Sequence, residues 1–135
     1  MNSAKWMLCA AAALALLVAG TRAGAQDQPI KRTELMRADL TNLDGREGVA
    51  YTAEIAPGGV AGKHTHPGDE FVYVLEGSLI IEPEGKEPVT LDAGEIVHLV
   101  QGVVHNARNA SDSAPAKALV FLVTEKGKPL AAAAE

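Results

Sequence analysis

The chain has 135 residues, with 12 Lys and Arg against 17 Asp and Glu, and its formal net charge at pH 7 is -5. This acidic balance, without any basic block, argues against nucleic acid and anionic membrane surfaces as partners. The one cysteine, Cys9, lies within the first 25 residues, and a chain cleaved after them would have no thiol for a disulfide, a zinc–thiolate site or an iron–sulfur cluster. The composition therefore favours a small molecule, or a metal ion held by His and carboxylate groups, as the partner.

The first 25 residues have the three-part layout of a secretory signal peptide. Lys5 precedes an apolar run of 14 residues, 6–19, and the small residues at 23–25 follow it. A membrane anchor is the alternative, but a helix that spans a bilayer needs about 20 apolar residues. We therefore predict cleavage between Ala25 and Gln26 and a periplasmic or secreted protein. No lipid anchor is expected, because no cysteine follows the small residues.

Residues 33–125 are predicted to form one all-β domain, between a flexible lead-in at 26–32 and a low-complexity tail at 126–135 that is frayed or loosely helical. Short runs rich in β-branched and aromatic residues alternate with turn residues, and no segment keeps a 3.6-residue apolar period. This pattern is typical of a β-sandwich or a small barrel. The expected strands lie at 48–56, 71–75, 79–81, 89–91, 96–100 and 119–125.

The strand at 71–75 is apolar on both faces. If Glu70 points inward, Val72 and Val74 follow it by the period of two, and Phe71, Tyr73 and Leu75 face outward. A contiguous apolar patch of this kind is rarely left in water. We expect it to be covered by a second subunit, which makes a homodimer, or by residues 30–40.

Four residues carry the candidate chemistry: His64, His66, Glu70 and His105. Residues two apart on a strand face the same way, so the first two imidazoles project together. A bend at 67–69 would return the Glu70 carboxylate to the same point, and a later turn would present His105 from another strand. Three imidazoles and one carboxylate suit a single divalent Mn, Fe, Ni, Co, Cu or Zn ion and leave open positions for a ligand. The alternative is that the paired histidines beside a Pro-Gly turn are simply solvated.

The spacing of these residues resembles the two motifs of the cupin superfamily. The first, G-x5-H-x-H-x3,4-E-x6-G, runs from Gly58 to Gly77, and the second, G-x5-P-x-G-x2-H-x3-N, runs from Gly94 to Asn109. Nine of the ten motif positions agree, and Val100 stands where the family has a proline that shapes a strand end. The resemblance implies a single-domain, antiparallel β-barrel of the cupin type (double-stranded β-helix, jelly-roll). It also implies a metal in the barrel mouth, ligated by the three histidines and the glutamate.

Five further residues are weaker site candidates. His98 could face the cavity as an acid or base, but a partnered core histidine is the commoner reading. Asp69 adjoins the predicted ligand Glu70 and should point the other way, and Glu76 precedes a hairpin glycine and is expected to be solvated. We expect Asn109 to bond backbone groups, and Tyr51 to be a packed strand aromatic rather than a hydrogen-bond donor at the barrel wall.

Proteins that resemble this chain include dioxygenases, oxalate-degrading enzymes, isomerases and pure binding proteins, so the fold does not decide the function. The first hypothesis is a metal-dependent oxidoreductase of the dioxygenase or quercetinase-like kind. Its substrate would be a small oxygen-rich or phenolic compound that chelates the ion, and Glu70 would serve as the catalytic base. The second hypothesis is a non-catalytic periplasmic module that binds metal or a small ligand. A metal-dependent sugar isomerase is a weaker third.

Overall fold

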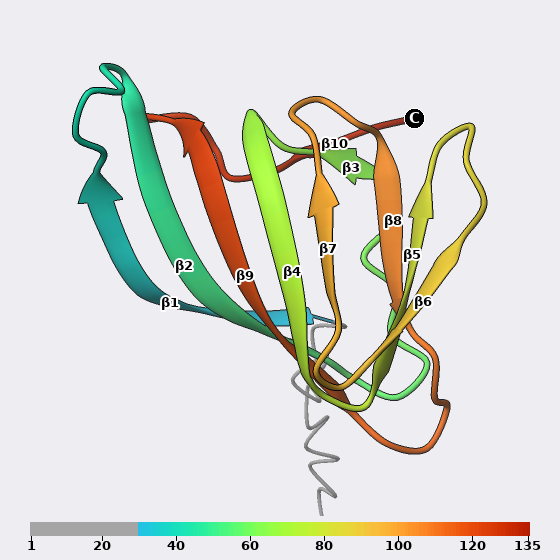
Figure 1. Ribbon diagram of the computed structural model, residues 1–135. Coiled ribbons are helices and arrows are strands. Elements are labelled where there is room, and N and C mark those ends of the chain that lie inside the picture. Colours follow the sequence, from blue (N-terminus) through green and yellow to red (C-terminus); the bar gives the residue numbers. More distant parts are fainter. Residues whose placement is uncertain (1–29) are drawn as a thin grey trace, which may run out of the picture.

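The computed structural model describes residues 30–135, so the expected signal peptide at 1–25 and the first part of the lead-in lie outside the described residues. Within this range no helix is long and apolar enough to cross a membrane. The regular secondary structure of residues 30–135 consists of strands (Figure 1). They are β1 (Ile30–Asp39), β2 (Arg46–Ile55), β3 (His64–Thr65), β4 (Gly68–Glu76), β5 (Ser78–Pro83), β6 (Val89–Asp92), β7 (Ile96–Leu99), β8 (His105–Asn109), β9 (Ala116–Glu125) and β10 (Ala132–Ala133).

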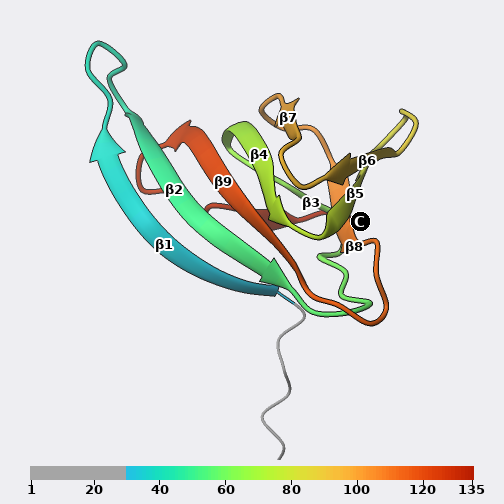
Figure 2. The same cartoon turned by 60° about the horizontal axis from the view of Figure 1, so that its bottom comes forward.

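The strands form two five-stranded sheets that face each other (Figure 2). The first sheet has the order β1-β2-β9-β4-β7 and the second the order β10-β3-β8-β5-β6, and all paired strands are antiparallel. Several neighbours, such as β2 and β9, are far apart in sequence, so the chain crosses repeatedly within and between the two sheets. This arrangement confirms the predicted all-β fold, a double-stranded β-helix.

The core lies between the sheets and follows from the period of two along each strand. In β9 every second residue is buried, from Ala116 to Thr124. Val72 and Val74 are 5% and 0% exposed, as predicted from an inward Glu70. The core is completed by Val49, Tyr51, Ala53, Ile55, Leu79, Ile81, Leu91, Leu99, Ala118, Val120 and Leu122.

Both expected ends of the domain are wrong by a few residues. Residues 30–32, expected in the lead-in, pair with β2, and Ile30 packs against the core. In the tail, which we expected to be frayed or loosely helical, β10 pairs with β3 and Leu130 packs against the core. Polar and Ala-rich sequences have only a weak intrinsic preference against the strand conformation. The hydrogen bonds to a neighbouring strand of the fold override this preference in both segments.

Gly68 brings two strands unusually close beside the candidate site. A Cβ atom at this position would lie 2.1 Å from the Val123 carbonyl oxygen and 2.5 Å from Thr124 Cα, both in the backbone of β9. Only glycine permits this approach. After a bend at Pro67, which we expected within 67–69, the chain enters β4, runs along β9 and brings Glu70 back to the histidines.

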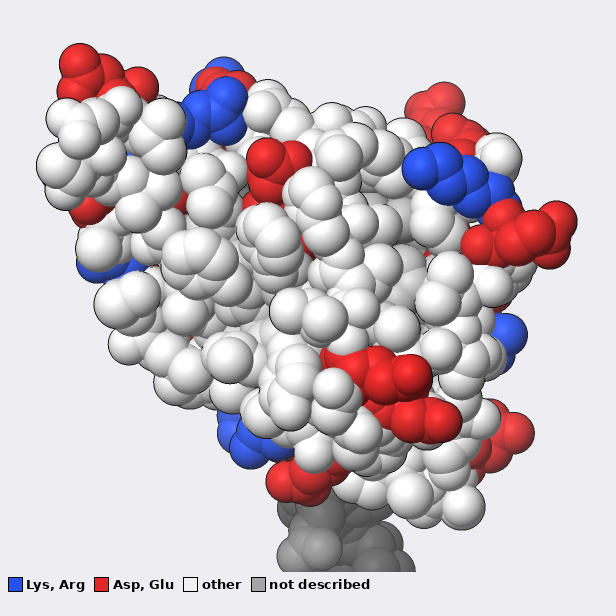
Figure 3. Space-filling model, in the orientation of Figure 1, with Lys and Arg blue, Asp and Glu red and all other residues white. Residues whose placement is uncertain are grey.

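The outer face of the first sheet carries the predicted apolar patch. Tyr73 and Leu75 are 38% and 39% exposed, and Ile96, paired with Tyr73 in β7, is 62% exposed. Figure 3 shows few charged side chains over β2, β9 and β4. Residues 30–40 do not cover this patch, because β1 extends the sheet at its edge beside β2 instead of lying over β4. That alternative is wrong.

We propose that a second copy of the chain covers the patch, and the prediction is a dimer in solution. Light scattering should give twice the mass of the chain. Ile96→Glu places a charge in the contact and should yield a monomer with an unchanged β-sheet circular dichroism spectrum, whereas Lys128→Glu, an exposed position outside the patch, should leave the dimer intact. A wild-type monomer would refute the homodimer.

Candidate metal centre

The four predicted site residues converge between the two sheets. His64 on β3 pairs with His105 at the start of β8, so one sheet holds two of the imidazoles side by side. His66 follows β3 directly, and Glu70 reaches the same point from β4 in the opposite sheet. The ring centroids lie 4.4 Å apart for His64 and His105, 4.9 Å for His64 and His66, and 5.3 Å for His66 and His105.

Backbone carbonyl groups fix the orientation of all three rings. His64 Nδ1 lies 2.8 Å from the Gly62 oxygen, His105 Nδ1 lies 3.1 Å from the Val103 oxygen, and His66 Nδ1 contacts the Leu130 oxygen. A carbonyl oxygen only accepts, so each Nδ1 carries the donated proton. In a neutral ring the lone pair is then on Nε2, which is the nitrogen that a metal would use.

The Nε2 atoms meet the Glu70 carboxylate at separations that suit a shared cation. Glu70 Oε2 lies 3.2 Å from His105 Nε2 and 3.3 Å from His66 Nε2. Both His66 Nε2 and Glu70 Oε2 are buried without a hydrogen-bond partner. Two ligands at right angles around an ion, each about 2.1 Å from it, would be about 3.0 Å apart. The donors therefore fit a metal ion.

The three histidines form the group that could hold a metal. Their ligand nitrogens all lie within 4.8 Å of one another. His66 and His105 are 4% and 3% exposed, whereas His64 is half-buried. The half-buried side leaves a path by which a ligand could reach the centre.

The pKa directions reflect the crowding of these groups. Burial lowers the pKa of His64, although its hydrogen bond to Gly62 opposes this. Burial also disfavours the charged forms of Glu70 and His105. For Glu70 the proximity of the three imidazole rings together outweighs burial, so its pKa is lowered. For His105 the proximity of Glu70 and the hydrogen bond to Val103 together outweigh burial, so its pKa is raised. Without a metal ion, a proton shared between Glu70 and His105 would hold the two side chains together. A bound metal ion would replace this proton.

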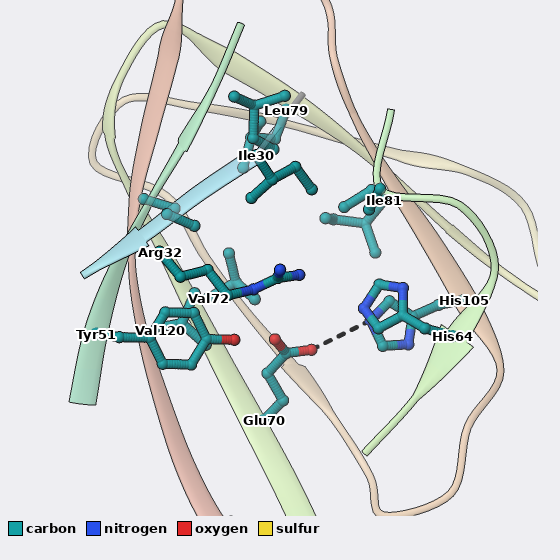
Figure 4. A pocket seen from close by; sticks show the side chains of 15 residues that line it. Ile30, Arg32, Tyr51, His64, Glu70, Val72, Leu79, Ile81, His105 and Val120 are labelled. Atoms are coloured by element: carbon teal, nitrogen blue, oxygen red, sulfur yellow. Dashed lines mark ion pairs between the residues drawn. The ribbon is translucent and has the colours of Figure 1, made fainter. Parts of the chain in front are cut away.

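An apolar pocket opens beside the centre and contains two polar residues that the sequence analysis did not place there. The pocket is partly open to solvent. Arg32 from β1 and Tyr51 from β2 point into it near Glu70 (Figure 4). The remaining wall is aliphatic and is formed by Ile30, Ala53, Ile55, Ala61, Val72, Leu79, Ile81, Ala107, Ala118 and Val120.

Tyr51 is 3% exposed, and we expected only a packed strand aromatic. Burial and the nearby charge of Glu70 raise its pKa, so the hydroxyl stays protonated at neutral pH and can donate a hydrogen bond into the pocket. Arg32 was not predicted as a site residue, because it lies in the segment that we expected to be a flexible lead-in. The only sequence signal is its position two residues after Ile30, which places both side chains on the same face of a strand.

The remaining sequence candidates lie away from the centre. His98 does not face the cavity: its ring stacks on Phe71, with centroids 4.6 Å apart, and its Nε2 lies 3.4 Å from Asp69 on the outer surface. The expected surface position of Asp69 agrees with this contact. Asn109 is buried and donates to the carbonyl groups of residues 55, 56 and 114, as expected for a residue that bonds the backbone. Glu76 is exposed.

Comparisons with known proteins agree with the fold. The family model for the cupin domain matches residues 51–122. Tetracenomycin polyketide synthase protein TcmJ of Streptomyces glaucescens is 35% identical over 91 residues, which cover 65% of this chain and 59% of that protein. The chain thus spans about three fifths of the length of this relative.

Two solved structures share the fold. An uncharacterised protein with a double-stranded β-helix domain from Klebsiella pneumoniae has a TM-score of 0.65 at 21% identity, covering 81% of this chain and 87% of its own. Oxalate oxidase in complex with glycolate has a TM-score of 0.63 at 23% identity, covering 81% of this chain and 57% of its own. Because the family model spans more than half of the chain and both cupin motifs lie on the strands that build the centre, this protein belongs to the cupin family.

Proposed function

We propose that this protein is a metal-dependent oxidoreductase of the dioxygenase kind, with one divalent transition metal held by His64, His66, Glu70 and His105. The single observation that carries the proposal is the convergence of three Nε2 atoms and one buried carboxylate at the polar end of an otherwise apolar pocket. Such a donor set leaves positions open for a substrate and for dioxygen.

The residues of the pocket have distinct parts in this proposal. A metal bound at the centre would supply Lewis acidity and redox chemistry. The histidines hold their Nε2 atoms in place through the backbone carbonyl groups behind them. Glu70, whose pKa is lowered, is ionised at neutral pH and can accept the proton of a substrate hydroxyl group. The aliphatic wall excludes water from the rest of the ligand.

The substrate proposed is a small compound with oxygen atoms at one end and an apolar body. One relative, named for a polyketide synthase, supports an organic substrate of this kind. A sugar fits the pocket less well, because its hydroxyl groups would face the aliphatic wall without partners, at a cost of about 1–3 kcal/mol each. The second candidate is a non-catalytic module that binds metal or a small ligand in the same pocket.

One prediction of this proposal concerns the metal. His66→Ala and His105→Ala should reduce bound metal from about one ion per chain to a small fraction, measured by mass spectrometry of dialysed protein. They should also abolish the rise in thermal stability on metal addition, which is about 2.7 kcal/mol when the metal is at 100 times its dissociation constant.

His98→Ala is the matched control, since it removes the one described histidine that lies outside the centre. It should bind metal like the wild type. Full metal content in both site variants would contradict the assignment of the ligands.

The reaction itself is tested by oxygen consumption. Protein loaded in turn with Fe, Mn, Ni or Cu should take up oxygen with at least one member of a panel of catechols, flavonols and diketones, with a turnover that scales with bound metal. If no metal supports uptake with any compound while the metal binds stoichiometrically, the protein is a binding module and the oxidoreductase proposal fails.

Glu70→Gln tests the carboxylate separately from the imidazoles. The amide keeps the size of the side chain but cannot accept the proton, so turnover should fall by about 100-fold or more, whereas part of the metal should remain. The comparison requires turnover per bound metal ion. A variant that retains the wild-type turnover per ion would show that Glu70 is not the base.

A further inference from the structure

The wall of the pocket contains one feature that the metal centre does not use, the guanidinium group of Arg32. Arg32 pairs with Ala53 of β2, and it lies two residues after Ile30, so both side chains face the pocket. Figure 4 shows the guanidinium group pointing toward the space between Tyr51, Glu70 and the imidazole rings. Among the residues that line the pocket in the described part of the chain, it is the one Lys or Arg.

Among the described residues Arg32 has no acidic partner, in contrast to several other basic residues of the fold. Arg37 contacts Glu34 and Glu47, and Arg108 contacts Glu82. Within residues 30–135 no carboxylate lies within 4.0 Å of the Arg32 guanidinium group. Glu70, the one acid in the pocket wall, directs its Oε2 atom to the histidines instead.

The charges of the pocket favour an anion. With neutral imidazoles, an ionised Glu70, Arg32 and the divalent ion of the proposed function, the formal charges of these groups add to +2. Surrounding aliphatic side chains lower the local dielectric and strengthen the attraction of a negative ligand group. A guanidinium group matches a carboxylate with two parallel N–H···O bonds, and the Tyr51 hydroxyl can donate a further bond nearby.

The rest of the pocket determines which chemical group can occupy the end of the ligand that lies away from Arg32. In Figure 4 the side chains of Ile30, Leu79 and Ile81 lie across the cavity from Glu70 and Tyr51. This wall offers no polar side chain, so only an apolar body gains by entering it. A small dianion such as oxalate would leave this space unfilled.

We propose that Arg32 is the residue that selects the substrate, by binding a carboxylate group attached to an apolar, aromatic or aliphatic body. This inference rests on the proposed function in placing the substrate in the same pocket. It adds the chemical class of the substrate, a monocarboxylate, and the role of β1, which brings the recognising group to the centre.

The test is a binding measurement that needs no turnover. Zinc-loaded wild-type protein is titrated by calorimetry with benzoate and hexanoate, and with the neutral benzamide and hexanamide as matched probes of the same shape. We expect each carboxylate to bind at least 10-fold more tightly than its amide. In Arg32→Gln this preference should disappear, with weaker carboxylate binding, little change for the amides and unchanged zinc content.

Lys31→Gln is the control variant, because this neighbouring residue loses the same charge but does not line the pocket. It should keep the wild-type preference, and Arg32→Lys should keep part of it. An undiminished preference in Arg32→Gln, an equal loss in Lys31→Gln, or no binding of either carboxylate at millimolar concentration would overturn the proposal. Zinc content separates the two ideas, since a protein that binds no metal refutes the metal centre, whereas a metal-bound protein indifferent to Arg32 refutes only this inference.

Discussion

The candidate centre depends on the hydrogen bonds that three backbone carbonyl groups accept from the histidine rings. These bonds place the proton on Nδ1 and leave Nε2 of His64, His66 and His105 with a lone pair facing the same space. The carbonyl groups come from three separate segments, and the one at Leu130 belongs to the tail that pairs with β3. The orientation of the donors is thus a property of the whole fold.

Much of the fold followed from the sequence, because period-two alternation in β2, β4 and β9 marks residues that face a shared core. The pairing of strands did not follow from it. Neighbours such as β2 and β9 lie far apart in the chain, and β10 is an Ala-rich segment that becomes a strand because β3 offers it free backbone groups. Intrinsic strand propensity does not indicate which strand a segment will pair with, because that partner is determined by the fold as a whole.

The centre itself was predictable because metal ligands need fixed residue types at fixed spacing. His64, His66, Glu70 and His105 were predicted as ligands of one ion, and the structure brings their side chains close together. Arg32 was not predicted, since a single basic residue in a polar segment has no characteristic spacing. His98, which the apolar strand around it led us to expect in the core, instead lies on the outer surface, where its ring stacks on Phe71.

The most direct test of the account is X-ray absorption spectroscopy of the protein loaded with one zinc ion per chain. The account predicts that three imidazole rings and one carboxylate oxygen surround the ion, with bonds of about 2.0–2.2 Å. A spectrum with fewer than two imidazole ligands in the wild-type protein would contradict the shared centre.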